Sequence, residues 1–173
     1  MTTLITGGSK CGKSTFAEMI LSSCKGRKVY IATLRPYGNN AEDIIARHVK
    51  MREGKGYITV EQFTDIGSAP VQRGDAVLLE DIGNLTANEM FTEKGISCPV
   101  VRVVSGVKSL SERVSELIIV TNEVGSDGKD YGSGTMDYIR AMAEISRRIA
   151  EYSDNVYECV YGIPIVLKGG KIC

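Results

Sequence analysis

The feature that most constrains this chain is a segment near its start, Gly7-Gly8-Ser9-Lys10-Cys11-Gly12-Lys13-Ser14, which fits the pattern G-x-x-x-x-G-K-[ST]. An apolar run at 3–6 precedes the segment and a helical pattern at 14–24 follows it. In such a loop, backbone N–H groups surround phosphate oxygens and the helix N-terminus adds its positive dipole. We therefore expect this segment, called the P-loop below, to bind a nucleoside triphosphate. Lys13 is expected at the β- and γ-phosphates and the Ser14 hydroxyl on Mg²⁺.

Apolar runs rich in β-branched residues alternate with longer helical patterns along the rest of the chain. The expected strands are 3–6, 29–32, 57–60, 76–79, 117–120, 156–160 and 163–167, and the expected helices are 14–24, 41–52, 101–116 and 136–152. This alternation predicts an α/β sandwich around a mostly parallel sheet, within a single domain spanning 1–173. Because only Tyr161-Gly162 separates the last two runs, they must form an antiparallel hairpin.

Two carboxylates end one of the expected strands. The run Val77-Leu78-Leu79 continues into Glu80-Asp81, and P-loop enzymes hold Mg²⁺ with an acidic residue at the end of a neighbouring strand. Successive strand residues point to opposite faces, so only one of the two can easily face the metal, and the spacing does not choose between them. The guanine-reading pattern Asn-Lys-x-Asp is absent. A kinase or nucleotidyltransferase is therefore favoured over a regulatory GTPase.

His48 is the only histidine of the chain, and it lies in the expected helix 41–52. Arg52 follows four residues later and would share its helix face. A neutral imidazole flanked by cations can attack a phosphorus atom and form a covalent intermediate. The alternative from the residues alone is an ordinary surface or packing histidine.

The charge, hydropathy and cysteine patterns exclude several other classes of protein. There are 21 basic and 21 acidic residues, interspersed, so no basic surface for nucleic acid is expected. No segment is long and apolar enough to span a membrane and no signal peptide is recognised, which predicts a cytoplasmic protein. The five cysteines are widely spaced and form no Cys-x-x-Cys, so neither a disulfide framework nor a zinc site is expected.

Beyond the P-loop, an ordered set of motifs resembles a specific family, the bifunctional adenosylcobinamide kinase/adenosylcobinamide-phosphate guanylyltransferases of cobalamin biosynthesis. The resemblance covers nearly the whole chain and includes the His48-x-x-x-Arg52 pattern. Its other motifs are the P-loop, Val29-Tyr30-Ile31-Ala32-Thr33, Thr59-Val60-Glu61, Leu78-Leu79-Glu80, Thr121-Asn122-Glu123-Val124-Gly125 and Gly162-Ile163-Pro164.

The resemblance implies a RecA-like fold, usually trimeric, and two reactions. ATP or GTP would phosphorylate adenosylcobinamide, and GMP would pass from GTP through a histidine to adenosylcobinamide phosphate. His48 matches the guanylylated histidine, and Glu80 matches the family's acidic residue, which favours it over Asp81 as the partner of Ser14 at Mg²⁺. The positions that match nucleotide contacts are Ile31, Ala32, Thr33, Arg52 and Glu61.

The chain departs from the family pattern between Gly125 and Arg147. The loop 125–134 contains no proline, and Ser146-Arg147 stands where the family has Asn-Gln. Two alternatives therefore accompany the bifunctional enzyme. One is a P-loop kinase of a small alcohol without guanylyl transfer, and the other is a GTP-binding regulatory module without turnover.

Overall fold

The computed structural model describes residues 1–36, 53–125, 128–129 and 131–170. The bounds of its elements, in chain order, are β1 Thr2–Thr6, α1 Lys13–Ser23, β2 Lys28–Ala32, β3 Ile58–Glu61, a 3-10 turn at Ile66–Ser68, β4 Ala76–Glu80, α3 Ile82–Met90, β5 Phe91–Thr92, β6 Gly95–Ile96, α4 Val100–Arg113, β7 Glu116–Val120, α5 Ser133–Tyr152, β8 Asn155–Val160 and β9 Ile163–Lys168.

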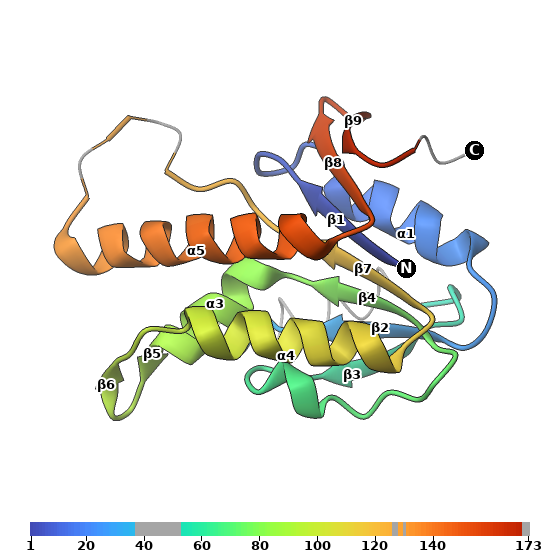
Figure 1. Cartoon of the computed structure of the whole chain (residues 1–173), viewed down its shortest axis with the longest axis horizontal. Coiled ribbons are helices and arrows are strands. Elements are labelled where there is room, and N and C mark those ends of the chain that lie inside the picture. The colour runs from blue at the N-terminus through green and yellow to red at the C-terminus, as the bar shows by residue number, and fades with distance from the viewer. Residues whose placement is uncertain (37–52, 126–127, 130, 171–173) are drawn as a thin grey trace.

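The main sheet has seven strands in the order β3-β2-β4-β7-β1-β8-β9. All neighbours pair in parallel except β8 and β9, which are antiparallel. Helix α1 covers one face of the sheet, and α3, α4 and α5 cover the other (Figure 1). The expected three-layer α/β architecture and its C-terminal hairpin are confirmed.

The core lies in two layers because neighbouring residues of each buried strand point to opposite faces of the sheet. In β1, Leu4 packs with the residues of α3, α4 and α5, whereas Ile5 packs with those of α1. In β2, Ile31 likewise packs with the residues of α3, α4 and α5, and Tyr30 packs with those of α1. Strands covered on both faces need apolar residues on both, which is why the sequence shows continuous apolar runs.

Several details differ from the sequence-based expectation, and the short strands β5 and β6 were not expected. The helix expected at 101–116 ends at Arg113, because Glu116 already pairs with Ala76 at the start of β7. Helix α3 was not expected, and it begins where Asp81 accepts a hydrogen bond from the backbone N–H of Asn84, at 2.7 Å. The helix expected at 41–52 lies outside the described residues. Of the helices described, none has the length and apolar character needed to cross a membrane.

Candidate active site

The P-loop connects the carboxyl end of β1 to the start of α1, at the edge of the sheet where the parallel strands end. Gly7 has a φ of 140° and Gly12 a φ of 101°, both in the region that residues with a Cβ rarely adopt. A Cβ on Gly7 would also lie 2.6 Å from the carbonyl oxygen of Cys159 in β8. The backbone conformation therefore favours glycine at both positions. At Gly7 the missing side chain also lets the loop pass close to β8.

Lys13 is held inside the curve of the P-loop. Its ammonium group donates hydrogen bonds to the carbonyl oxygens of Gly7 at 3.0 Å and of Gly8 at 2.6 Å, and the residue is only 5% exposed. A buried cation of this kind places a positive charge at the centre of the loop. This is the position from which a lysine can bind the terminal phosphates of a nucleotide, as the sequence pattern predicts.

Glu80, the last residue of β4, reaches the P-loop. Its carboxylate accepts hydrogen bonds from the hydroxyl of Ser14 and, at 3.0 Å, from the hydroxyl of Tyr30 in β2. Ser14 lies in the first turn of α1, which packs over β4 and β7, so the glutamate meets it directly from the end of β4. Hydroxyl and carboxylate oxygens are the ligand types that Mg²⁺ prefers, and the pair fits a magnesium ion shared with nucleotide phosphates.

Asp81 has a different environment from Glu80. Its side chain accepts hydrogen bonds from the backbone N–H of Asn84 and, at 3.1 Å, from the amide of Asn122 at the end of β7. Burial raises the pKa of the Asp81 carboxyl, and the bonds from Asn84 and Asn122 oppose that rise. Burial and the charge of Asp81 also raise the pKa of Tyr138 to about 12. Asp81 thus caps α3 and ties it to β7, while Glu80 faces Ser14.

The nucleotide contacts expected on β2 and β3 lie across β4 and β7 from the P-loop strand. Ile31 is buried in the core, and Ala32 pairs with the exposed Glu61 at the ends of their strands. Thr33 is buried, and its hydroxyl donates to the carbonyl of Asp81 at 2.7 Å. The same hydroxyl accepts from the backbone N–H of Asp81 at 2.8 Å. His48 and Arg52, the expected nucleophile and its neighbouring cation, lie outside the described residues.

Two residues that position the site were not singled out from the sequence alone. Tyr30 orients Glu80, and Asn122 binds Asp81. Asn122 belongs to the Thr121-Asn122-Glu123-Val124-Gly125 motif, so the sequence marks its position. Its hydrogen bond to Asp81 appears only in the structure. The next residue of the motif, Glu123, donates its backbone N–H to the carbonyl of Gly7 at 3.1 Å. The motif therefore joins the end of β7 to the P-loop.

Comparison with known proteins decides the family. Residues 3–167 match the family described as cobinamide kinase / cobinamide phosphate guanyltransferase. The chain belongs to this family. The match extends beyond the P-loop, from Thr3 in β1 to Leu167 in β9.

Members of the cobinamide kinase family with curated names align over nearly their full length. The bifunctional adenosylcobalamin biosynthesis protein CobU of Salmonella typhimurium is 25% identical, over 97% of this chain and all of its own. The protein of the same name from Escherichia coli is also 25% identical, over the same shares. The corresponding CobP of Pseudomonas aeruginosa is 26% identical, over 98% of each chain.

The region that departs from the cobinamide kinase pattern borders the P-loop strand. A cavity of about 180 Å³ lies where β1 and β7 end and α5 passes over them, and Thr6, Asn122 and Met142 are among its lining residues. Ser146 also lines it and lies 3.4 Å from the Thr121 hydroxyl, oxygen to oxygen. A serine hydroxyl of the segment 125–147 therefore borders a cavity beside the candidate active site.

Proposed function

We propose that this chain is a bifunctional enzyme of cobalamin biosynthesis. It phosphorylates the hydroxyl of adenosylcobinamide with ATP or GTP, and it transfers GMP from GTP to adenosylcobinamide phosphate. The observation that carries the proposal is the contact of Ser14 with Glu80 beside the buried Lys13, within a chain that matches the family over residues 3–167. The contact brings together the residues that a P-loop kinase needs for its metal and its terminal phosphates.

In the kinase reaction, the acceptor hydroxyl attacks the γ-phosphorus and gives up its proton to solvent. The bond from the γ-phosphorus to the β,γ-bridging oxygen breaks, and ADP or GDP leaves. Lys13 offsets the negative charge that develops on the transferring group. Ser14 and Glu80 would hold Mg²⁺, which supplies further charge neutralisation at the phosphates when bound. Tyr30 keeps the Glu80 carboxylate turned toward Ser14, since it donates to the second carboxylate oxygen.

In the guanylyl transfer, His48 is the proposed nucleophile. An imidazole nitrogen attacks the α-phosphorus of GTP, the bond to the β-phosphate breaks and pyrophosphate leaves. A phosphate oxygen of adenosylcobinamide phosphate then attacks the same phosphorus, the P–N bond breaks and the histidine is restored. Arg52 would stabilise the charge on the transferring group. The support for both residues is the family resemblance of the His48-x-x-x-Arg52 pattern.

The remaining contacts and properties are proposed on the same resemblance. Ile31, Ala32, Thr33 and Glu61 would contribute to nucleotide binding together with the P-loop. The protein would act in the cytoplasm as a homo-oligomer, a trimer by family resemblance. Light scattering coupled to size-exclusion chromatography measures the oligomer directly, and a monomeric mass would contradict that part of the proposal.

Intact-mass spectrometry tests the histidine route. The protein is incubated with GTP and Mg²⁺ and quenched at alkaline pH, where a phosphorus–nitrogen bond survives. Wild type is expected to gain the mass of one GMP, and His48→Ala is expected to gain none. His48→Ala should still phosphorylate adenosylcobinamide with ATP, which shows that the variant is folded. Equal labelling of the two proteins would remove His48 from the mechanism.

The altered region Gly125–Arg147 favours a second candidate, a kinase without guanylyl transfer. In that case wild type phosphorylates adenosylcobinamide or another small alcohol and takes up no GMP. A regulatory module would instead bind GTP with no turnover of either kind. Product analysis with adenosylcobinamide, ATP and GTP separates the three possibilities in one experiment.

A further inference from the structure

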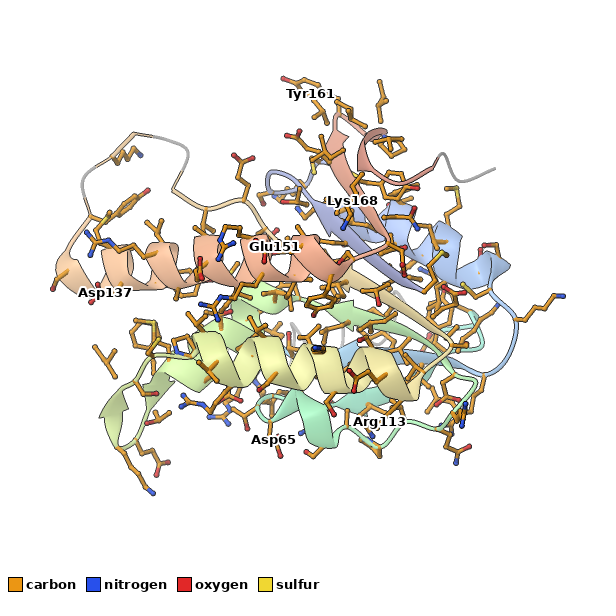
Figure 2. All side chains as sticks on the ribbon, in the orientation of Figure 1. Asp65, Arg113, Asp137, Glu151, Tyr161 and Lys168 are labelled. Atoms are coloured by element: carbon orange, nitrogen blue, oxygen red, sulfur yellow. The ribbon has the colours of Figure 1, made fainter. Side chains whose placement is uncertain are left out.

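The small cavity at the ends of β1 and β7 lies on the face of the sheet that α5 covers, away from α1. In Figure 2, Asp137 lies near the start of α5 and Glu151 near its end, and the cavity borders the helix between them. Its volume of about 180 Å³ is below the range of about 300–1,000 Å³ for sites that hold a whole small molecule. The cavity can therefore take one arm of a larger ligand.

Glu123, which lines this cavity, is tied to the P-loop. Its backbone N–H donates to the carbonyl oxygen of Gly7 at 3.1 Å, and the ammonium group of Lys13 donates to the same oxygen at 3.0 Å. Because one oxygen accepts both bonds, the two nitrogens lie within two hydrogen-bond lengths of each other. A group bound beside Glu123 is therefore close to the lysine expected at the γ-phosphate.

The lining of the cavity combines polar and apolar groups. Hydroxyl and carboxylate oxygens come from Thr6, Ser146 and Glu123, and apolar surface comes from Val124, Met142 and Ala143. Glu123 is exposed, and within the described part of the chain its carboxylate has no hydrogen-bond or salt-bridge partner. This lining suits a short aliphatic alcohol, because the hydroxyl can donate to the carboxylate while the carbon chain packs on the apolar groups.

We propose that this cavity is the acceptor subsite of the kinase reaction, and that Glu123 accepts a hydrogen bond from the hydroxyl that attacks the γ-phosphorus. Its ligand is a short aliphatic alcohol, carried as an arm of a larger molecule whose body lies outside the cavity. The subsite rests on the proposed function only in that the nucleotide at the P-loop gives its γ-phosphoryl group to an alcohol.

The position of the subsite agrees with the chemistry of the transfer. The hydroxyl oxygen forms the new bond to the γ-phosphorus, the bond to the β,γ-bridging oxygen breaks, and the hydroxyl proton passes to solvent. The acceptor must therefore approach the terminal phosphate from a place that the nucleotide leaves open. The cavity meets this condition, because β4 lies between β7 and the expected nucleotide contacts on β2 and β3.

The first test separates acceptor binding from nucleotide binding. Glu123→Gln keeps the size of the side chain and the backbone bond to Gly7, and it removes the charge. The kcat/KM for adenosylcobinamide should fall about tenfold or more, whereas the Kd for ATP with Mg²⁺, measured by calorimetry, should stay within about twofold. Glu93→Gln, at an exposed position of the β5–β6 hairpin, is the matched control and should leave both values unchanged.

A second variant fills the cavity. Ala143 is an exposed residue of α5 that lines it, and leucine is nearly as favourable as alanine in a helix. Ala143→Leu should lower the kcat/KM for adenosylcobinamide about tenfold or more and leave the Kd for ATP unchanged. Thr135→Leu places the same side chain at an exposed position of the same helix outside the cavity, and its kcat/KM should stay within about twofold of wild type.

The outcomes distinguish the subsite from the proposed function. Wild-type kcat/KM in both Glu123→Gln and Ala143→Leu would overturn the subsite and leave the kinase assignment in place. Equal losses of ATP affinity and of acceptor turnover would show that the cavity only supports the P-loop, and they would overturn the subsite too. If wild type phosphorylated no adenosylcobinamide, the proposed function would fall and the subsite with it.

A binding readout that needs no turnover uses the thiol introduced by Ala143→Cys. Its rate of alkylation, followed by peptide mass mapping, should fall when adenosylcobinamide is added and stay constant with ATP alone. Cys98 is exposed and lines a separate pocket between β6 and α5, so it is the internal reference. Protection of Cys98 in place of the introduced thiol would assign the acceptor to that other pocket and overturn the proposal.

Discussion

The hydroxyl of Ser14 donates a hydrogen bond to the carboxylate of Glu80, which lies 66 residues further along the chain. This bond joins the first turn of α1 to the carboxyl end of β4. We expect Mg²⁺ to bind at these two oxygens, because they adjoin the loop that holds the phosphates. The side chains that would hold the metal are thus already together in the folded chain.

Replacing Glu80 by glutamine should weaken the response to magnesium. The amide keeps the size of the side chain and loses its charge, so the Mg²⁺ concentration for half-maximal kinase activity should rise at least about tenfold. Glu93→Gln, which changes an exposed glutamate of the β5–β6 hairpin, is the matched control. Identical magnesium titrations for wild type and Glu80→Gln would show that this carboxylate does not serve the metal.

Replacing Lys13 by methionine should abolish most of the turnover. Methionine fills a similar volume but cannot offset charge on the transferring phosphoryl group, so kcat should fall about 100-fold or more. Steady-state assays with ATP and adenosylcobinamide measure the effect. Lys25→Met, at an exposed position just after α1, controls for the loss of one lysine. A Lys13→Met protein with near wild-type kcat would refute the P-loop assignment.

Replacing Gly12 by alanine should separate the hairpin from the P-loop. The new Cβ would lie 2.9 Å from the Cα of Gly162, at a φ of 101°. Strain of this kind costs about 1–3 kcal/mol, to be measured by urea unfolding. Gly8→Ala is the control, because a Cβ there meets nothing within 4 Å, and it should change stability by less than about 0.5 kcal/mol. Equal stabilities of the two variants would contradict the close packing.

The ion pair of Asp75 with Arg27 should appear in the pH dependence of stability. Arg27 donates to both carboxylate oxygens, at 2.8 and 2.6 Å, and its hydrogen bonds hold the pKa of the buried Asp75 below the ordinary value of 3.8. A lowered pKa in the folded state stabilises the protein above pH 3.8, and the effect disappears as the pH falls through the folded pKa.

Asp75→Asn should therefore be less stable than wild type at pH 7, by about 2 kcal/mol. The amide carries no negative charge, so its hydrogen bonding to the Arg27 guanidinium is weaker than that of the carboxylate. The difference should shrink as the pH drops below about 4. Chemical unfolding at several pH values measures both effects. Asp137→Asn, which removes a carboxylate from an exposed pair with Arg140, should change stability by less than about 1 kcal/mol. A constant difference across the pH range would contradict the shifted pKa.

Strand positions could be predicted from the sequence because strands buried on both faces need continuous apolar runs, as in Leu117–Val120. Helix α3 could not, because it is short and its start depends on the Asp81 side chain, whose alternative role as a metal ligand was equally compatible with the spacing. The end of α4 could not be predicted either. The helix ends at Arg113 because Glu116 pairs with Ala76 in β4, a strand that is distant in the sequence, and no local pattern shows this pairing.

The amino-acid sequence by itself determined the phosphate-binding loop, the parallel sheet and the hairpin, because each follows from local pattern: glycines at fixed spacing, runs of apolar residues, and a connection too short for a crossover. Only the tertiary structure decided which carboxylate faces Ser14, since Glu80 and Asp81 are adjacent in the chain. They differ in their hydrogen-bond partners: Glu80 binds Ser14 and Tyr30, whereas Asp81 binds Asn122 and caps α3. Likewise, the contact of Gly162 with Cys11 depends on β8 pairing beside β1. Long-range strand pairing fixed those positions, and no local pattern encodes it.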